Sequence, residues 1–488
     1  MRLSSAIYFL RTTFRQITSR KFLLGGLSAL IAVSLVLASY RETSPMVAFS
    51  ANAFVESVGI VTHLTYQDTP YVQNWAKADA SQNVSELLGA LHIRHVRDRI
   101  IHPEIQSWGS YLRYRFADLY ADYGIKFISI LDLKREEILD QSQIAPFLDS
   151  YASESLQAST GESIPIRNLL EGIEGPNEYD RHNDIEERDP NWAEALQMYQ
   201  ARLQQELTAR AALASIPLIT PSLIYTRYCG SVLPSFRETI THGNLHVYAT
   251  HPYFRVPTDN LQWHLNHGRK CFGNKPVYVT ETGYLTGGGG ISDKTIAKYT
   301  SRILSEFFLE PQIERTYLYS LIDTLPDIDN WGLIRPEKTG EVQNGFDQFK
   351  LSPKPSYYAV SSLLSLLDEG VWDEDKEQWI VPAVSADSVD ISFEHKQRNT
   401  HKLLLKKSDG YYYLLLWQEV ESFNPRRGNF DPSPDSVLVS IPEQYEFDSI
   451  FKYNREFMLT EEPLRTGSNT LSVQVPDSLM LLRFRDIS

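Results

Sequence analysis

The sequence predicts an α/β protein: a (β/α)8 TIM barrel followed by a small antiparallel β-domain. From residue 58 to about residue 367, short β-branched or aromatic runs alternate with helical stretches. After about residue 370 strand-like runs continue without long helical stripes. The 488-residue length admits about three domains, and the 42% apolar and 22% charged content excludes a disordered chain.

Eight strand-like runs predict the barrel. Their average spacing of about 37 residues suits one strand plus one crossover helix per step. The runs begin near Val58, Ile93, Ile125, Leu169, Pro217, Leu245, Pro276 and Arg315. Eight such units over residues 57–367 fit the size of a (β/α)8 barrel. A doubly wound open sheet is the alternative, and the lack of a glycine-rich phosphate turn after the first strand disfavours it.

The segments between the runs show helical patterns. Over residues 84–91, apolar side chains at i, i+3, i+4 and i+7 predict one buried helical face. Asp189 and Pro190 predict a helix start, because Asp suits the N-cap and Pro suits the first helical position. Ser292 predicts another N-cap, and Gly124 predicts a helix end before the third strand.

The last part of the chain predicts a separate β-domain. Two apolar runs within residues 402–417 flank Ser408-Asp409-Gly410, which is a hairpin signal. Further strands are expected at 471–475 and 479–484. We therefore divide the chain into residues 1–40, a catalytic barrel over 41–368, and a β-sandwich-like domain over 371–488.

The N-terminal 40 residues resemble a targeting segment. Five basic residues precede an apolar run over 22–38, and no acidic residue occurs before Glu42. This order predicts an export signal, with small residues at Val36 and Ala38 for cleavage. The alternative is an uncleaved anchor, since about 17 residues is the lower limit for spanning a membrane. Either way we expect a secreted, periplasmic or cell-envelope protein, with membrane attachment through 22–38 if the segment is retained.

Charge and cysteine content exclude several classes of function. The net charge of −14 argues against nucleic acid as the main partner, because phosphate binding needs a basic face. Export would permit Cys229 and Cys271 to pair, but the sequence slightly favours two unpaired core residues. The histidines between 242 and 267 form no H-E-x-x-H motif, so we expect no metal and no cofactor.

Two glutamates at strand ends indicate the chemistry. In a barrel of this kind the active site lies at the C-terminal ends of the strands. Glu178 follows the fourth predicted strand and Glu281 ends the seventh. Strands 4 and 7 face each other across the barrel mouth, so the two carboxyls are expected to meet there. Such a pair can cleave a glycosidic bond, one as the acid and the other as the nucleophile.

These residues resemble glycoside hydrolase clan A. Asn177-Glu178 after strand 4 and Thr280-Glu281-Thr-Gly-Tyr284 at strand 7 match its two motifs in the right order. The segments 319–323, 330–334 and 352–356 resemble its eighth strand and the region that follows. The resemblance covers roughly residues 57–367 and implies retaining, double-displacement hydrolysis of a β-linked glycan.

The resemblance also implies roles for individual residues. Glu178 would be the acid/base and Glu281 the nucleophile, while Asn177 would bind the substrate 2-hydroxyl. Arg97 and Tyr253 would hold the Glu281 carboxylate, and Trp331 would form an apolar floor for a sugar ring. His63 and His251 also end strands, so we expect them to line the substrate pocket.

Three functions remain open from the sequence. The first is the retaining glycoside hydrolase, acting on an oligo- or polysaccharide. The second is a catalytically inactive carbohydrate-binding barrel of the cell envelope, which intact glutamates at both positions disfavour. The third is a structural envelope protein held by its N-terminal segment.

Overall fold

The computed structural model describes residues 40–67, 69–104, 109–135, 138–181, 189–248, 258–286, 290–324, 330–343, 345–395 and 399–488. The predicted signal or anchor, with its apolar run at 22–38, lies outside these residues. Within the described ranges, no helix combines the length and the apolar character needed to cross a membrane.

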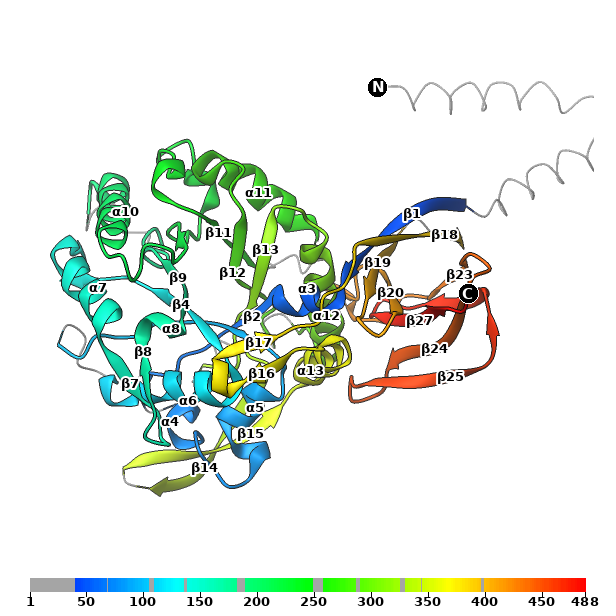
Figure 1. Cartoon of the computed structure of the whole chain (residues 1–488), viewed down its shortest axis with the longest axis horizontal. Helices are drawn as coiled ribbons and strands as arrows, with labels where there is room; N and C mark the ends of the chain where they lie inside the picture. The colour runs from blue at the N-terminus through cyan, green and yellow to red at the C-terminus, as the bar shows by residue number, and fades with distance from the viewer. Residues whose placement is uncertain are drawn as a thin grey trace, which may run out of the picture.

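A closed barrel of eight parallel strands forms the larger part of the molecule (Figure 1). The sheet order is β10-β9-β4-β3-β2-β13-β12-β11, and a parallel bridge between Ile219 and His242 joins its two ends. The strands are β2 (Val58–Val61), β3 (His95–Asp98), β4 (Lys126–Ile130), β9 (Leu170–Glu174), β10 (Leu218–Ile219), β11 (Gly243–Tyr248), β12 (Val277–Gly283) and β13 (Ile313–Leu318). Each contains or adjoins one predicted run, which confirms the barrel.

Helices surround the barrel strands. The longer ones are α6 (Tyr114–Tyr123), α7 (Ile144–Ser153), α10 (Trp192–Thr208), α11 (Thr258–Phe272), α12 (Asp293–Phe308) and α13 (Pro355–Leu367), and the shorter α5 spans Val84–Gly89. Gly124 ends α6 with φ 61°, and the Ser292 hydroxyl accepts from the Thr295 amide at the start of α12, as predicted. The start of α10 differs: it begins at Trp192, because the Asp189 carboxylate instead accepts from the Asn191 amide and the Tyr179 hydroxyl.

The C-terminal part forms a nine-stranded sheet beside the barrel (Figure 1). Its order is β25-β24-β27-β20-β19-β1-β18-β23-β26. The strands are β1 (Tyr40–Ser50), β18 (Asp387–His395), β19 (Thr400–Lys406), β20 (Tyr411–Gln418), β23 (Asp435–Ser440), β24 (Tyr445–Tyr453), β25 (Leu459–Ser468), β26 (Thr470–Val475) and β27 (Met480–Asp486). The hairpin predicted around Gly410 joins β19 to β20.

Strand β1 belongs to this sheet rather than to the barrel. It pairs antiparallel with β18 and parallel with β19, for example Met46 with Val389 and Ala48 with Leu404. From the sequence we expected residues 41–50 to belong to the barrel, whose predicted range is 41–368. The chain instead crosses the β-domain first and enters the barrel through α3 (Ala51–Glu56).

Buried ion pairs join the β-domain to α12 of the barrel. Arg302 is completely buried and contacts the Glu419 carboxylate at 2.7 Å through Nη2. One turn earlier, the Lys298 ammonium lies 2.8 Å from the carboxylate of Asp477. Burying these charges is tolerated because each has a partner, so the two domains are fixed to each other by specific contacts.

Cys229 and Cys271 form a disulfide, with their Cα atoms 5.1 Å apart. The preference for two unpaired cysteines was therefore wrong. Cys229 follows a short 3-10 turn after β10, and Cys271 lies in the last turn of α11, which packs against that turn. The separation of 42 residues along the chain does not reveal this proximity, which tertiary packing creates.

Replacing both cysteines by serine should lower the free energy of unfolding by about 2–4 kcal/mol, because the crosslink restricts the unfolded chain. Urea unfolding followed by tryptophan fluorescence measures the change. Peptide mapping without reductant should first recover the linked Cys229 and Cys271 peptides. Two free thiols in the native protein would contradict the disulfide.

Candidate active site

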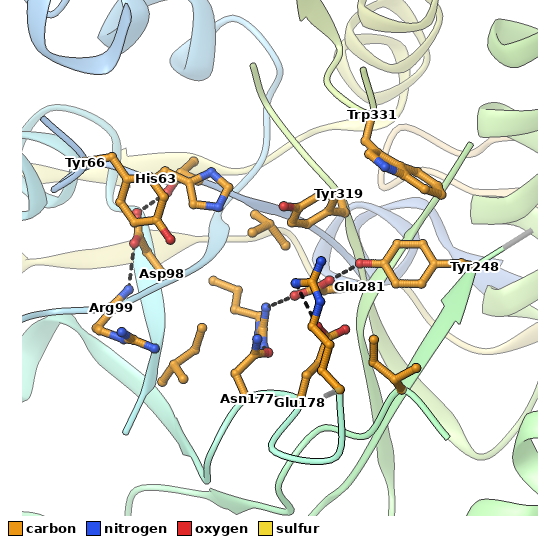
Figure 2. A pocket seen from close by; sticks show the side chains of 16 residues that line it. His63, Tyr66, Asp98, Arg99, Asn177, Glu178, Tyr248, Glu281, Tyr319 and Trp331 are labelled. Atoms are coloured by element: carbon orange, nitrogen blue, oxygen red, sulfur yellow. Dashed lines mark hydrogen bonds and ion pairs between the residues drawn. The ribbon is translucent and has the colours of Figure 1, made fainter. Parts of the chain in front are cut away.

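A cavity of about 270 Å³ opens at the C-terminal ends of the barrel strands (Figure 2). Glu178 and Glu281 lie at its centre. Tyr248 and Trp331 stand on one side, and His63, Tyr66 and Arg99 stand on the opposite side. The cavity therefore has two carboxyls between an aromatic wall and a more polar one.

Arg97 lies beneath the cavity and organises its floor. The side chain comes from β3, is 1% exposed, and donates through Nε and Nη2 to both oxygens of Glu174, at 2.6 and 2.7 Å. Nη1 donates to Glu281 at 2.5 Å, and Nη2 also reaches the Asn177 amide oxygen at 2.6 Å. These charge-assisted contacts outweigh the burial of Arg97, so its pKa lies above the ordinary arginine value.

A tight turn after β9 presents Asn177 and Glu178. Glu178 has φ 47°, the left-handed region that non-glycine residues seldom adopt, and its amide donates to Ser222 beyond β10. The Ser222 hydroxyl also donates to the Asn177 amide oxygen at 2.9 Å. Because Ser222 and Arg97 both use that oxygen, the NH2 group is the end of Asn177 that can donate to a substrate hydroxyl.

His246 lies between the two central carboxyls. Its Nδ1 is 2.8 Å from Oε1 of Glu178 and 3.7 Å from Oε2 of Glu281. Oxygens of the two carboxyls themselves lie within 4.8 Å of each other. Burial disfavours the charged imidazole, but the attraction of Glu281 and the hydrogen bond to Glu178 outweigh burial and raise the pKa of His246.

Glu281 is held in its ionised form. Burial of its carboxyl opposes ionisation, but the charges of His246 and Arg97 and the hydrogen bond from Tyr248 leave its pKa below the ordinary glutamate value. The Tyr248 hydroxyl donates to Oε2. Burial and the neighbouring carboxylates raise the pKa of Tyr248 well above 10, so this phenol keeps its proton and remains a donor.

The loop after β13 brings Trp331 to the cavity. Asp323 accepts from the Gly332 amide and from the Lys354 ammonium, both at 2.7 Å. A Cβ at position 332 would overlap the backbone of Ile322 and Asp323, so only glycine fits beside Trp331. The buried Asp323–Lys354 pair therefore fixes the position of the tryptophan ring.

The opposite wall contains His63 and Asp98. Burial lowers the pKa of His63 to about 4, so this imidazole is neutral near pH 7, and its ring centroid lies 4.6 Å from that of Tyr66. Burial raises the pKa of Asp98 to about 6. The Asp98 carboxylate accepts from the Thr62 hydroxyl and the amides of Leu64 and Arg99, so it orders the turn around His63.

The structure brings most of the predicted site residues together. Those that line the cavity are Arg97, Asn177, Glu178, Glu281, Trp331 and His63. Tyr253 and His251 lie outside the described residues. In the described part of the chain, Tyr248 makes the contact to Glu281 that we expected from Tyr253.

Sequence reasoning missed His246, Tyr248 and Glu174. His246 and Tyr248 are two residues apart on β11, so the alternation of a strand places them on the same face. The contact to Glu281 was instead assigned to Tyr253, five residues further along the chain. Glu174 gave a signal as well, because it is a carboxyl that ends a strand buried at every position except Glu171.

The same cluster has the donor types of a metal site. Among the described residues, Glu178, His246 and Glu281 are the group whose ligand atoms lie close enough together for one ion. Glu281 is already paired with the Arg97 guanidinium, which would repel a cation, and His246 must lose its shared proton to ligate. The donor set therefore suits proton sharing better than metal binding.

Comparison with known proteins agrees with this geometry. The family model described as the glycosyl hydrolase catalytic core matches residues 177–339, about a third of the chain. The match begins at Asn177 and includes both Glu178 and Glu281. No curated protein matches the chain significantly.

Solved structures share the fold at low sequence identity. A monomeric β-xylosidase from Caulobacter crescentus CB15 is 10% identical, with TM-score 0.54 and coverage of 91% of this chain and 98% of that chain. A family 39 glycoside hydrolase from Xanthomonas axonopodis pv. citri is 12% identical, with the same TM-score and coverage. A family 39 enzyme from Bacteroides cellulosilyticus WH2 is 14% identical, with TM-score 0.50 and coverage of 89% and 82%. The catalytic-core match over a third of the chain and the barrel fold shared with these enzymes agree with the resemblance to glycoside hydrolase clan A.

Proposed function

We propose that the protein hydrolyses a β-linked glycan or glycoside with retention of configuration, by double displacement. One observation carries the proposal: oxygens of Glu178 and Glu281 lie within 4.8 Å of each other. Retaining enzymes hold their carboxyl groups about 5–5.5 Å apart, whereas inverting enzymes separate them by ~6.5–9.5 Å to admit a water. Carboxyl oxygens this close to each other fit the closer, retaining arrangement, which supports direct attack by a carboxylate.

In the first step Glu281 attacks the anomeric carbon. The bond from that carbon to the glycosidic oxygen breaks, and an ester bond to Glu281 forms. Glu178 gives its proton to the departing oxygen. Arg97 and Tyr248 keep Glu281 ionised and oriented before the attack, while the NH2 group of Asn177 is placed to donate to the 2-hydroxyl.

In the second step a water replaces the leaving group. Glu178, now ionised, takes a proton from the water, and the resulting oxygen attacks the anomeric carbon. The ester bond to Glu281 breaks and the enzyme returns to its starting state. His246 touches both carboxyls, so it can stabilise whichever one carries the negative charge at each stage.

An inactive carbohydrate-binding barrel is the alternative function. It would retain the aromatic wall of Tyr248 and Trp331 but has no need for an ionised, buried Glu281. The buried contacts of Arg97, Tyr248 and His246 to that carboxylate are costly to assemble without a catalytic role. These contacts favour a catalytic function over an inactive binding protein.

We propose that the protein acts outside the cytoplasm. The buried Cys229–Cys271 disulfide supports this location, because disulfides form and persist in oxidising compartments. Fractionation of the source cells, with activity and antibody detection in each fraction, tests the proposal. Recovery of the protein in the cytoplasm would contradict it.

Replacing the acid/base should separate catalysis from binding. Glu178→Gln should lower kcat by about 10²–10⁴-fold on glycosides with poor leaving groups, while sugar binding measured by calorimetry survives. Glu178→Ala with added azide should release a β-glycosyl azide, because a small anion can then attack the glycosyl-enzyme.

Asp180→Asn is the matched control, since it removes a buried carboxyl two residues away that does not line the cavity. It should retain activity within about one order of magnitude. Normal hydrolysis by Glu178→Gln would exclude Glu178 as the acid/base.

The pH profile should depend on His246. Glu281 must be ionised to attack, so kcat/KM falls as the pH drops through its pKa. His246→Gln removes a cation that lowers this pKa, and the acidic limb of the kcat/KM profile should therefore move to higher pH.

His264→Gln is the control, because burial lowers the pKa of His264 to about 4 and the residue does not contact Glu281. Its acidic limb should coincide with that of the unmodified enzyme. An unshifted limb in His246→Gln would show that this imidazole does not control the ionisation of Glu281.

A further inference from the structure

One wall of the cavity carries a cation that the catalytic carboxyls do not use. Arg99 follows β3 and lines the cavity opposite Tyr248 and Trp331 (Figure 2). Glu281 is already held by Arg97, and Glu178 by His246. Within the described residues, the ion pair of Arg99 is with Asp132 instead.

Asp132 does not neutralise this wall. Its Oδ2 atom is 3.3 Å from Nη2 of Arg99 and 3.0 Å from Nζ of Lys134. Two cations therefore share one carboxylate, and the trio keeps one positive charge in excess. In a chain with a net charge of −14, such a local excess beside the cavity would select for a negatively charged group.

Arg99 also retains unused hydrogen-bonding capacity. Its Nε atom is buried and has no partner among the described residues. The side chain as a whole is 26% exposed, so part of the guanidinium can be reached from the cavity. A buried N–H without an acceptor is unfavourable, and the planar guanidinium fork matches the oxygens of a carboxylate or sulfate.

The other polar groups of this wall are already engaged or uncharged. The Asp98 carboxylate also lines the cavity, but it already accepts from Thr62 and from the amides of Leu64 and Arg99. His63 is neutral near pH 7. Arg99 is therefore the charged donor that this wall offers to a ligand.

We propose that the sugar bound in the cavity carries an anionic group, the carboxylate of a uronic acid or a sulfate ester, and that Arg99 recognises it. The proposal rests on the glycosidase function proposed above and names its substrate class. Arg99 is then a specificity-determining residue, separate from the machinery that breaks the bond.

Matched pairs of aryl glycosides test this recognition. The pairs are 4-nitrophenyl β-D-glucuronide with the β-D-glucoside, the β-D-galacturonide with the β-D-galactoside, and the β-D-glucoside 6-sulfate with the unsulfated glucoside. The enzyme should prefer the anionic member of a pair by at least about tenfold in kcat/KM. Preference within the uronide pairs identifies a carboxylate, and preference within the sulfate pair identifies a sulfate ester.

Variants of Arg99 and Lys134, the two cations that share Asp132, separate recognition of the anionic group from a structural effect on this wall. Arg99→Met should lower the ratio of anionic to neutral kcat/KM by at least about tenfold. Lys134→Met removes the other cation from the same carboxylate but does not line the cavity, so the ratio should persist. Arg99→Lys keeps the charge without the fork and should give an intermediate ratio, which preserves the test if Arg99→Met does not fold.

Two results would overturn the proposal. One is equal or better hydrolysis of the neutral members, and the other is an unchanged ratio in Arg99→Met. If no pair is hydrolysed, the proposed glycosidase function fails on these glycosides. Calorimetry on Glu178→Gln with glucuronate, glucose 6-sulfate and glucose then tests separately whether the cavity binds an anionic sugar. Binding of glucuronate or glucose 6-sulfate but not glucose, lost when Arg99→Met is added, would uphold the proposal. If no anionic sugar is bound selectively, the proposal is overturned.

Discussion

The buried guanidinium of Arg97 is the group on which the rest of the site depends. It emerges from β3 and contacts Glu174 at the end of β9, Glu281 on β12 and Asn177 in the turn after β9. Without it, two carboxyls would be buried next to each other with too little opposing charge. The same contacts that join three parts of the barrel therefore make an ionised carboxylate available at its mouth.

The surroundings of Glu178 and Glu281 differ in a way that suits two roles. Glu281 accepts from Arg97 and Tyr248 and lies close to His246, so its negative charge is stabilised on several sides. Glu178 is held by a strained turn against Ser222, and His246 and the more distant Arg181 are its charged partners. An ionised nucleophile and a proton donor are expected from such unequal environments.

Much of the barrel was predictable from the sequence, because its strands are buried apolar runs at regular spacing. The pairing of Glu178 with Glu281 followed from that spacing, since parallel strands end at the same mouth. The contact of Tyr248 was not found, because the contact to Glu281 was assigned to Tyr253, five residues further along the chain. Strand ends depend on pairing with neighbours, which a single sequence does not record.

Long-range packing accounts for the other features that the sequence did not predict. Nothing in residues 40–50 indicates that they pair with strands more than 330 residues further along the chain. The bond between Cys229 and Cys271 likewise depends on how α11 packs against the turn after β10. The role of Arg97 could be inferred only from resemblance. Its contact to a second carboxylate, Glu174, was found only in the structure, although the sequence shows that carboxyl at the end of a strand.

The configuration of the first sugar product tests the central claim most directly. Proton NMR of a hydrolysing β-glycoside in deuterated buffer, recorded before the anomers equilibrate, distinguishes the two outcomes. If Arg97 and Tyr248 hold an ionised Glu281 for direct attack, the β-anomer appears first and the α-anomer grows in only by mutarotation. Initial release of the α-anomer would mean that water attacks in a single step, and it would contradict the account.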